Sequence, residues 1–137
     1  MRNIRSKQKG LTLGGLIVVL GFIAALVTFA VRAFPLYNEK MQIVSAVNTV
    51  VSDPEAAGKT DHELRSLFLR NINATTNIDR FNDRNIKEHV IIEKPRNPGE
   101  PKILHLKYES IGPFVHELQL LMVVDMEFPV RGNEGGE

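Results

Sequence analysis

The feature that most constrains this chain is an uncharged apolar run at residues 11–31, close to the N-terminus. An α-helix rises about 1.5 Å per residue, so roughly 20 apolar residues are enough to cross the hydrocarbon core of a bilayer. A cleaved secretory signal has a shorter apolar core, of about 7–15 residues, followed by a small-x-small cleavage site. Here the run is longer and is followed by Arg32, Phe34 and Pro35. We therefore predict a retained transmembrane helix over residues 11–34 rather than a signal peptide that is removed.

Basic residues precede this run, and they predict its orientation. The leader, residues 1–10, contains Arg2, Arg5, Lys7 and Lys9. Because lysine and arginine concentrate on the cytoplasmic side of membrane helices, the N-terminus is expected in the cytoplasm and the rest of the chain across a bacterial inner membrane. That remainder is expected to be a periplasmic α+β domain at 35–131 and a disordered, glycine-rich tail at 132–137.

Small residues gather on one side of the predicted transmembrane helix. At about 100° per residue they form one narrow face, and the opposite face carries bulky aliphatic side chains. This small-residue face consists of Gly10, Gly14, Gly21, Ala25 and Thr28. Helices associate in lipid through close backbone approach across small residues, so we predict that the face docks on another membrane helix. Glycine is also common in membrane helices that have no such role.

The composition excludes several classes of function. The chain has no cysteine, which removes disulfides, thiol nucleophiles and thiolate metal sites. Its net charge of +1 is too small for a surface that displaces counterions from nucleic-acid phosphates. The basic leader is better explained by topology and by anionic lipid headgroups. The 137 residues leave room for one anchor and one small domain with a modest core.

A second apolar stripe follows the membrane helix. Proline removes a backbone donor and disfavours helix in the residue before it, so Phe34-Pro35 is expected to end or kink the first helix. Apolar residues then recur at helical spacing over about 36–51, which predicts a helix continuing out of the membrane. The partner expected for its apolar stripe is the sheet of the domain.

A further helix starts at a recognisable cap. Thr60 and Glu63 form a capping-box pattern, in which each side chain hydrogen-bonds to the backbone amide of the other residue. The helix they start is expected to end at about Ile72. Residues 73–85 are polar and are expected to form a loop with one helical turn around 78–81.

The last third of the chain alternates apolar and polar residues with a period of two, which indicates strands. The predicted strands cover residues 88–94, 102–109 and 117–129, separated by a turn at 95–101 and a break at 110–113. The predicted fold class is α+β: an N-terminal transmembrane helix followed by a small domain of two helices packed on a three-stranded antiparallel meander. An open sheet of this kind also has edges that can accept a partner strand.

Residues able to carry chemistry are scattered. The histidines are His62, His89, His105 and His116. None of them has the i, i+4 spacing of a helical zinc site, and His89 with His105 is expected to be a surface pair rather than a metal site. Asp125 and Glu127 are expected on the solvent face of the last strand. Because the sequence has no nucleophile elbow and no phosphate-binding glycine loop, we expect no catalytic, metal or cofactor-binding residues, and a protein that is not an enzyme.

Residues 9–13, with the sequence KGLTL, stand immediately before the apolar helix. This segment resembles the processing site of type IV pilins and pseudopilins, in which a peptidase cuts after the glycine, here Gly10. That family carries a glutamate five residues into the mature chain, where this sequence has Gly15. The resemblance implies an alternative function, a minor pseudopilin-like subunit whose mature chain begins at Leu11.

A second resemblance covers most of the chain. In chain order its segments are Lys9-Gly10-Leu11-Thr12, Pro35-Leu36-Tyr37, Glu63-Leu64-Arg65 with Leu67, Tyr108-Glu109, Pro113, and the valine-rich strand ending at Phe128. Together they resemble an uncharacterised gammaproteobacterial family of small single-pass membrane proteins, the DUF4845 type. Members are typically encoded between signal peptidase I and ribonuclease III. The resemblance implies work near signal peptidase I or the secretion machinery, and it supplies no mechanism and no site residues.

These observations predict a non-enzymatic accessory protein of the inner membrane with a periplasmic domain. The expected partners are a membrane protein, with signal peptidase I as the candidate, the lipid bilayer, and a second copy of the chain. No cofactor and no nucleic acid are expected. The small-residue face is the predicted contact with a partner helix.

Overall fold

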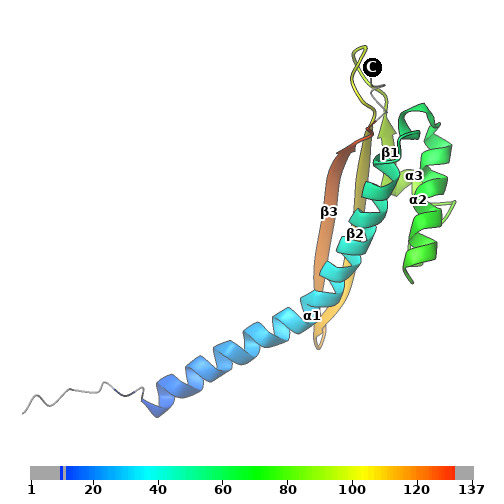
Figure 1. Ribbon diagram of the computed structural model, residues 1–137. Coiled ribbons are helices and arrows are strands. Elements are labelled where there is room, and N and C mark those ends of the chain that lie inside the picture. The colour runs from blue at the N-terminus through cyan, green and yellow to red at the C-terminus, as the bar shows by residue number, and fades with distance from the viewer. Residues whose placement is uncertain (1–9, 11, 132–137) are drawn as a thin grey trace, which may run out of the picture.

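The computed structural model describes Gly10 and residues 12–131 (Figure 1). Its elements are α1 (Leu13–Val51), the 3₁₀ turn η1 (Ala56–Gly58), α2 (Asp61–Thr75), α3 (Ile86–His89), β1 (Val90–Glu93), β2 (Ile103–Val115) and β3 (Leu118–Pro129). The topology prediction rests on Arg2, Arg5, Lys7 and Lys9, which lie outside the described residues, as does the tail at 132–137.

α1 is one continuous helix of 39 residues, although Pro35 lies within it. The expectation that the helix ends at this proline is wrong, whereas Figure 1 shows the bend expected of a helix that contains one. The helix continues because packing holds the segment beyond the proline in place. Leu36, Ile43 and Val47 all lie buried after it. Burial of this apolar stripe outweighs the one hydrogen bond that proline removes.

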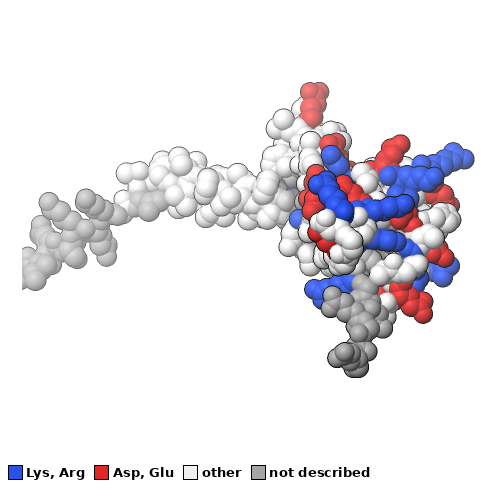
Figure 2. Space-filling view, turned by 90° about the horizontal axis from the view of Figure 1, so that it is seen from above, with Lys and Arg blue, Asp and Glu red and all other residues white. Residues whose placement is uncertain are grey.

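The N-terminal half of α1 is long and apolar enough to cross a membrane, and the rest of the described chain does not cover its apolar window. Figure 2 shows this half as an uncharged rod, with the Lys, Arg, Asp and Glu side chains gathered over the folded domain. Thr12 caps the start of the helix, where its Oγ1 accepts a hydrogen bond from the Gly15 amide at 3.3 Å. The described residues therefore contain one helix able to span a membrane, near the N-terminus.

α2 begins at the predicted capping box. The Thr60 Oγ1 accepts from the Glu63 amide at 3.3 Å, and the Glu63 carboxylate accepts from the Thr60 amide at 2.7 Å. The Thr60 amide and hydroxyl both donate to the Glu63 carboxylate, and these two hydrogen bonds lower the pKa of Glu63 below its ordinary value because they favour the charged form. The helix runs three residues past the predicted end, to Thr75, and Thr76 caps it through a hydrogen bond to the Ile72 carbonyl at 2.7 Å.

The short helical turn in the following loop lies later than predicted. No helix forms at 78–81 in the described chain, and the turn is α3, Ile86–His89. The reason is the local hydrogen bonding of asparagine. The Asn82 side chain accepts from the backbone amides of Arg84 and Asn85 at 3.0 and 3.1 Å, which starts a turn at this position instead. The predicted first strand consequently starts two residues late, at Val90.

The three strands form one antiparallel sheet in the order β1-β2-β3, as predicted. β2 extends to Val115, so the break predicted at 110–113 is wrong. β1 pairs with β2 only as far as Leu106, and beyond that point β2 has β3 as its one strand neighbour. Pro113 is tolerated there because one side of β2 has become an edge, where a missing backbone donor leaves no strand partner unpaired.

The core lies between one sheet face and the two long helices. It contains the inward side chains of β2, the buried face of α2 and the C-terminal half of α1. Representative members are Leu104, Leu106 and Val124 from the sheet, Phe68 and Ile72 from α2, and Ile43 and Val50 from α1. The α+β fold class, with two helices packed on an antiparallel meander, is confirmed.

Candidate functional site

The small-residue face of α1 is open. Gly14 and Gly21 lie in the protruding half of the helix, and a Cβ added at either one, or at Gly10, would meet no other atom within 4 Å. Ala25 and Thr28 are also exposed. Thr28 donates its hydroxyl hydrogen to the Ala24 carbonyl at 2.8 Å, so its donor is already used within the helix. No described residue of the chain occupies this face, and its role in docking stays a prediction.

The same side of α1 changes role along the helix. Counted at about 100° per residue, the face that carries Gly14 and Gly21 continues into the one that carries Ile43, Ala46 and Val50. These last three residues are buried in the domain core. The small-residue face is thus the N-terminal continuation of the side on which the domain packs, and α1 joins the two without a loop.

A polar cluster joins α1, the loop before α3 and strand β2 just beyond the apolar half of the helix. The Arg80 Nε lies 2.6 Å from a Glu39 carboxylate oxygen. The Arg80 guanidinium also donates to the Ser110 Oγ at 3.0 Å and to the Glu109 carbonyl. Ser110 in turn donates to the other Glu39 oxygen at 3.2 Å. We call Glu39, Arg80 and Ser110 the Glu–Arg–Ser cluster.

Tyr108 lies under this cluster. The Arg80 guanidinium carbon is 5.5 Å from the centroid of the Tyr108 ring, and Phe81 packs edge-to-face on the same ring at 5.7 Å. Burial raises the pKa of the Tyr108 phenol to about 12, and the nearby Glu39 carboxylate adds to that effect while Arg80 opposes it. The Tyr108 hydroxyl is buried and makes no hydrogen bond within the described residues.

The Glu–Arg–Ser cluster is built to hold three segments together rather than to act on a substrate. Ser110 is only 1% exposed, so no external molecule reaches its hydroxyl. The Arg80 guanidinium and the Glu39 carboxylate neutralise each other's charge across the 2.6 Å contact between them. Sequence reasoning assigned no role to these residues, because Ser110 and Glu39 are 71 positions apart.

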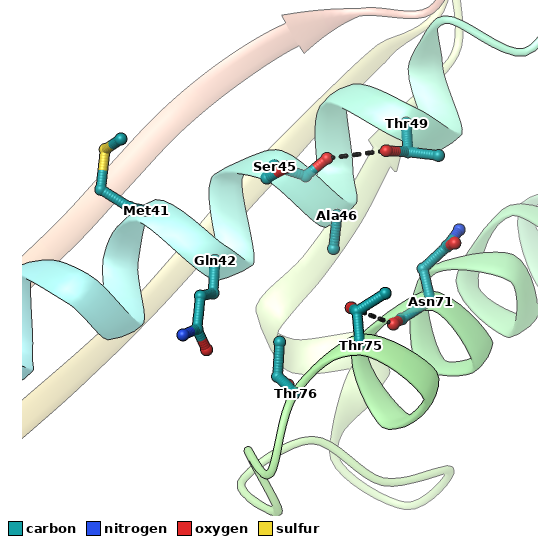
Figure 3. Close-up of a pocket in the computed structure, with 8 residues that line it drawn as sticks. All are labelled: Met41, Gln42, Ser45, Ala46, Thr49, Asn71, Thr75 and Thr76. Carbon is teal, nitrogen blue, oxygen red and sulfur yellow. Dashed lines mark hydrogen bonds between the residues drawn. The ribbon is translucent and has the colours of Figure 1, made fainter.

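A groove of about 310 Å³ lies between α1 and α2. Figure 3 shows its lining: Met41, Gln42, Ser45, Ala46, Thr49, Asn71, Thr75 and Thr76. Two of the hydroxyls are bonded within their own helices, from Thr49 to the Ser45 carbonyl at 3.0 Å and from Thr75 to the Asn71 carbonyl at 2.6 Å. None of the lining residues is titratable, so this groove offers no general acid, general base or activated nucleophile.

The histidines and carboxylates singled out from the sequence do not form a site in the described chain. The His89 Nδ1 lies 2.9 Å from the Lys107 carbonyl. His105 lies between Glu93 and Glu127, with nitrogen–oxygen distances of 3.4 Å to each, across the outward face of the three strands. Among the residues described, no group of three or more His, Asp or Glu side chains has an arrangement that could hold a metal ion. Asp125 and Glu127 face solvent, as predicted.

The comparisons with known proteins give a family and no function. A protein-family model described as a domain of unknown function, DUF4845, matches residues 32–123. No curated protein and no solved structure matches the chain. The matched segment starts near the end of the apolar run and covers the C-terminal half of α1, α2, α3 and most of the sheet.

Proposed function

Because the chain belongs to the DUF4845 family, whose function is unknown, we propose a function from its own residues: a non-enzymatic, single-pass interaction protein of the bacterial inner membrane. The observation that carries this proposal is the open small-residue face on a helix that runs unbroken into the domain core. A partner helix bound on that face would be linked to the domain by a continuous helix, without a flexible joint.

The physical case for docking rests on the properties of lipid as the solvent of a membrane helix. Lipid chains are as apolar as leucine, so membrane helices gain from association chiefly through close van der Waals packing. The bulky aliphatic side chains on the opposite face of α1 pack equally well against lipid chains and need no protein partner. Gly14 and Gly21 leave a shallow track along the helix that a neighbouring backbone can approach closely. Association on this track would place the partner beside the point where the domain begins.

The partner we propose is signal peptidase I, on the basis of the gene neighbourhood that the family resemblance implies. The orientation belongs to the same proposal: N-terminus in the cytoplasm and domain in the periplasm, as Arg2, Arg5, Lys7 and Lys9 predict. A bacterial secretion component is a fitting partner for a domain on that side of the membrane. The role, in this proposal, is binding and not chemistry.

The test is co-purification from native inner membranes in mild detergent. We expect Gly14→Leu combined with Gly21→Leu to abolish recovery of signal peptidase I while insertion into the membrane is unchanged. The matched control is Gly15→Leu combined with Ala30→Leu, which adds similar bulk, smaller by one methyl group, outside the small-residue face. Equal recovery from both double variants would refute the docking face, and absence of signal peptidase I from the wild-type eluate would refute this partner.

The alternative function is a minor pseudopilin-like subunit. It is favoured by the protruding apolar half of α1, which is free to pack against further copies of itself. N-terminal sequencing of the mature protein separates the two proposals. A chain that begins at Leu11 supports the subunit, and an intact leader supports the accessory protein.

A further inference from the structure

The tip of the β2–β3 hairpin is apolar on both faces of the sheet. Ile111, 61% exposed, and Leu121 lie on the outward face, where the exposed Gln119 is polar, and Phe114 with Leu118, 64% exposed, end the inward face. An antiparallel sheet in water covers one face with its core and keeps the other polar. The hairpin tip departs from this pattern, because it exposes apolar side chains on both faces. Such exposure is favourable where the surroundings of the tip are apolar.

The apolar character is confined to the half of the hairpin beside the turn. Farther along the same outward face, Lys107 pairs with Asp125 and His105 pairs with Glu127. Both carboxylate side chains are exposed. The outward face of the sheet is therefore graded, from charged at the far end of the domain to apolar at the tip, within a single pair of strands.

The tip lies beside α1, at the end of its apolar half (Figure 1). The Phe114 ring packs edge-to-face on the Phe29 ring with centroids 6.0 Å apart. Gly112 packs so closely on Leu36 that an added Cβ would lie 3.1 Å from the Leu36 Cδ1. Phe29 belongs to the apolar run, and Arg32, the first charge beyond it, is only about 4.5 Å farther along the helix axis.

We propose that this tip, residues 111–121, inserts into the headgroup–acyl boundary of the same membrane that α1 crosses. If Phe29 lies inside the edge of the hydrocarbon, its contact with Phe114 places the hairpin at that edge as well. Apolar surface elements of this kind sink about 5–10 Å into the boundary. The turn residues His116 and Glu117 are polar and exposed, so they limit the depth and remain among the headgroups.

Lipid is the occupant that the geometry favours over a protein. A protein partner or a second copy would have to cover both faces of the tip, and the inward face is closed on one side by α1 itself. Lipid surrounds a protruding hairpin without needing a complementary shape. The apolar patch is also continuous with the apolar helix through Phe29, Phe114 and Leu36, so both would lie in one bilayer.

The consequence is a second point of membrane attachment. A single helix is free to rotate about its axis in the bilayer, whereas a helix and a hairpin held by the same surface are not. Through Phe29–Phe114 and Leu36–Gly112 the hairpin therefore fixes the rotation of α1. This inference stands whether or not the partner proposed above is correct.

The test uses the full chain, which contains no tryptophan and therefore accepts single-tryptophan reporters. Leu118→Trp reports on the tip, and Leu121→Trp is a second reporter on the opposite face of the same strand. Ile91→Trp is the matched control, since it is an exposed aliphatic residue on the outward face of β1, far from the turn. All three positions are exposed, and thermal unfolding checks that each variant keeps its fold.

Each variant is reconstituted into phosphatidylcholine vesicles and into vesicles of phosphatidylcholine brominated on the acyl chains near the headgroup. We expect bromine to quench the Leu118→Trp and Leu121→Trp emission about twofold or more and to leave Ile91→Trp nearly unchanged, because only the tip lies within the boundary. Equal emission in the two kinds of vesicle for both tip reporters would overturn the proposal. Efficient disulfide formation between copies of Leu118→Cys would overturn it in favour of a second copy as the occupant.

Discussion

Arg80→Met tests whether the Glu–Arg–Ser cluster holds the domain together. Methionine keeps a stem of similar length over the Tyr108 ring and removes the guanidinium, which contacts Glu39, Ser110 and the Glu109 carbonyl. The variant leaves Glu39 with one donor from the cluster, the Ser110 hydroxyl. We expect the free energy of unfolding to fall without loss of the fold.

The magnitude follows from the kind of bond and its exposure. A hydrogen bond to a charged group contributes about 1.5–3 kcal/mol, and Arg80 makes more than one. The side chains of Arg80 and Glu39 are 30% and 21% exposed, so water replaces part of what is lost. We therefore expect a loss of about 2–3 kcal/mol rather than the full sum, which lowers the melting temperature of a domain of this size by about 10 °C or more.

The assay is thermal unfolding of the full-length protein in detergent, followed by circular dichroism. Glu39→Gln and the double variant complete a double-mutant cycle, in which we expect a coupling of about 1 kcal/mol or more between the two side chains. Arg84→Met is the matched control, because Arg84 lies in the same loop and is exposed. A loss from Arg80→Met no larger than that from Arg84→Met, or additivity in the cycle, would refute the role assigned to the cluster.

Three further predictions concern pH and capping. The pKa of Tyr108 is raised from 10 to about 12 in the folded chain, so the stability it contributes is complete below pH 10 and is lost as the pH rises towards 12. Alkaline unfolding curves should therefore show a smaller decline in this range for Tyr108→Phe, with little change at pH 7 because the hydroxyl has no hydrogen-bond partner in the described chain. Thr60→Ala should lower stability by about 1 kcal/mol by removing the α2 cap, measured by thermal unfolding at pH 7. Because the pKa of Glu63 is lowered, its contribution is present above its ordinary pKa and is lost as the pH falls through the folded value, a loss that Glu63→Gln should not show.

Local patterns in the sequence were enough to predict the long helices, the three strands and the side of each that faces the core. The apolar run, the Thr60–Glu63 capping box and the alternation of Leu104, Leu106 and Tyr108 each depend on residues within a few positions of one another. Such patterns act through spacing along one helix or strand, so they can be recognised without the fold. They led to the α+β class and to the helix that can span a membrane.

The remaining features depend on distant contacts. The packing of the core decides that α1 continues through Pro35. The point where β1 ends along β2 decides that β2 continues through Pro113. Each residue alone predicts a break, and tertiary burial overrides that preference.

The candidate sites divide in the same way. The small-residue face is a property of one helix, and the sequence by itself determined which residues share it. The Glu–Arg–Ser cluster joins positions 71 residues apart, and the contact of Phe29 with Phe114 depends on how the hairpin lies on α1. Only the tertiary structure brings these groups together, because their partners are chosen by the packing of separate elements and not by spacing along the chain.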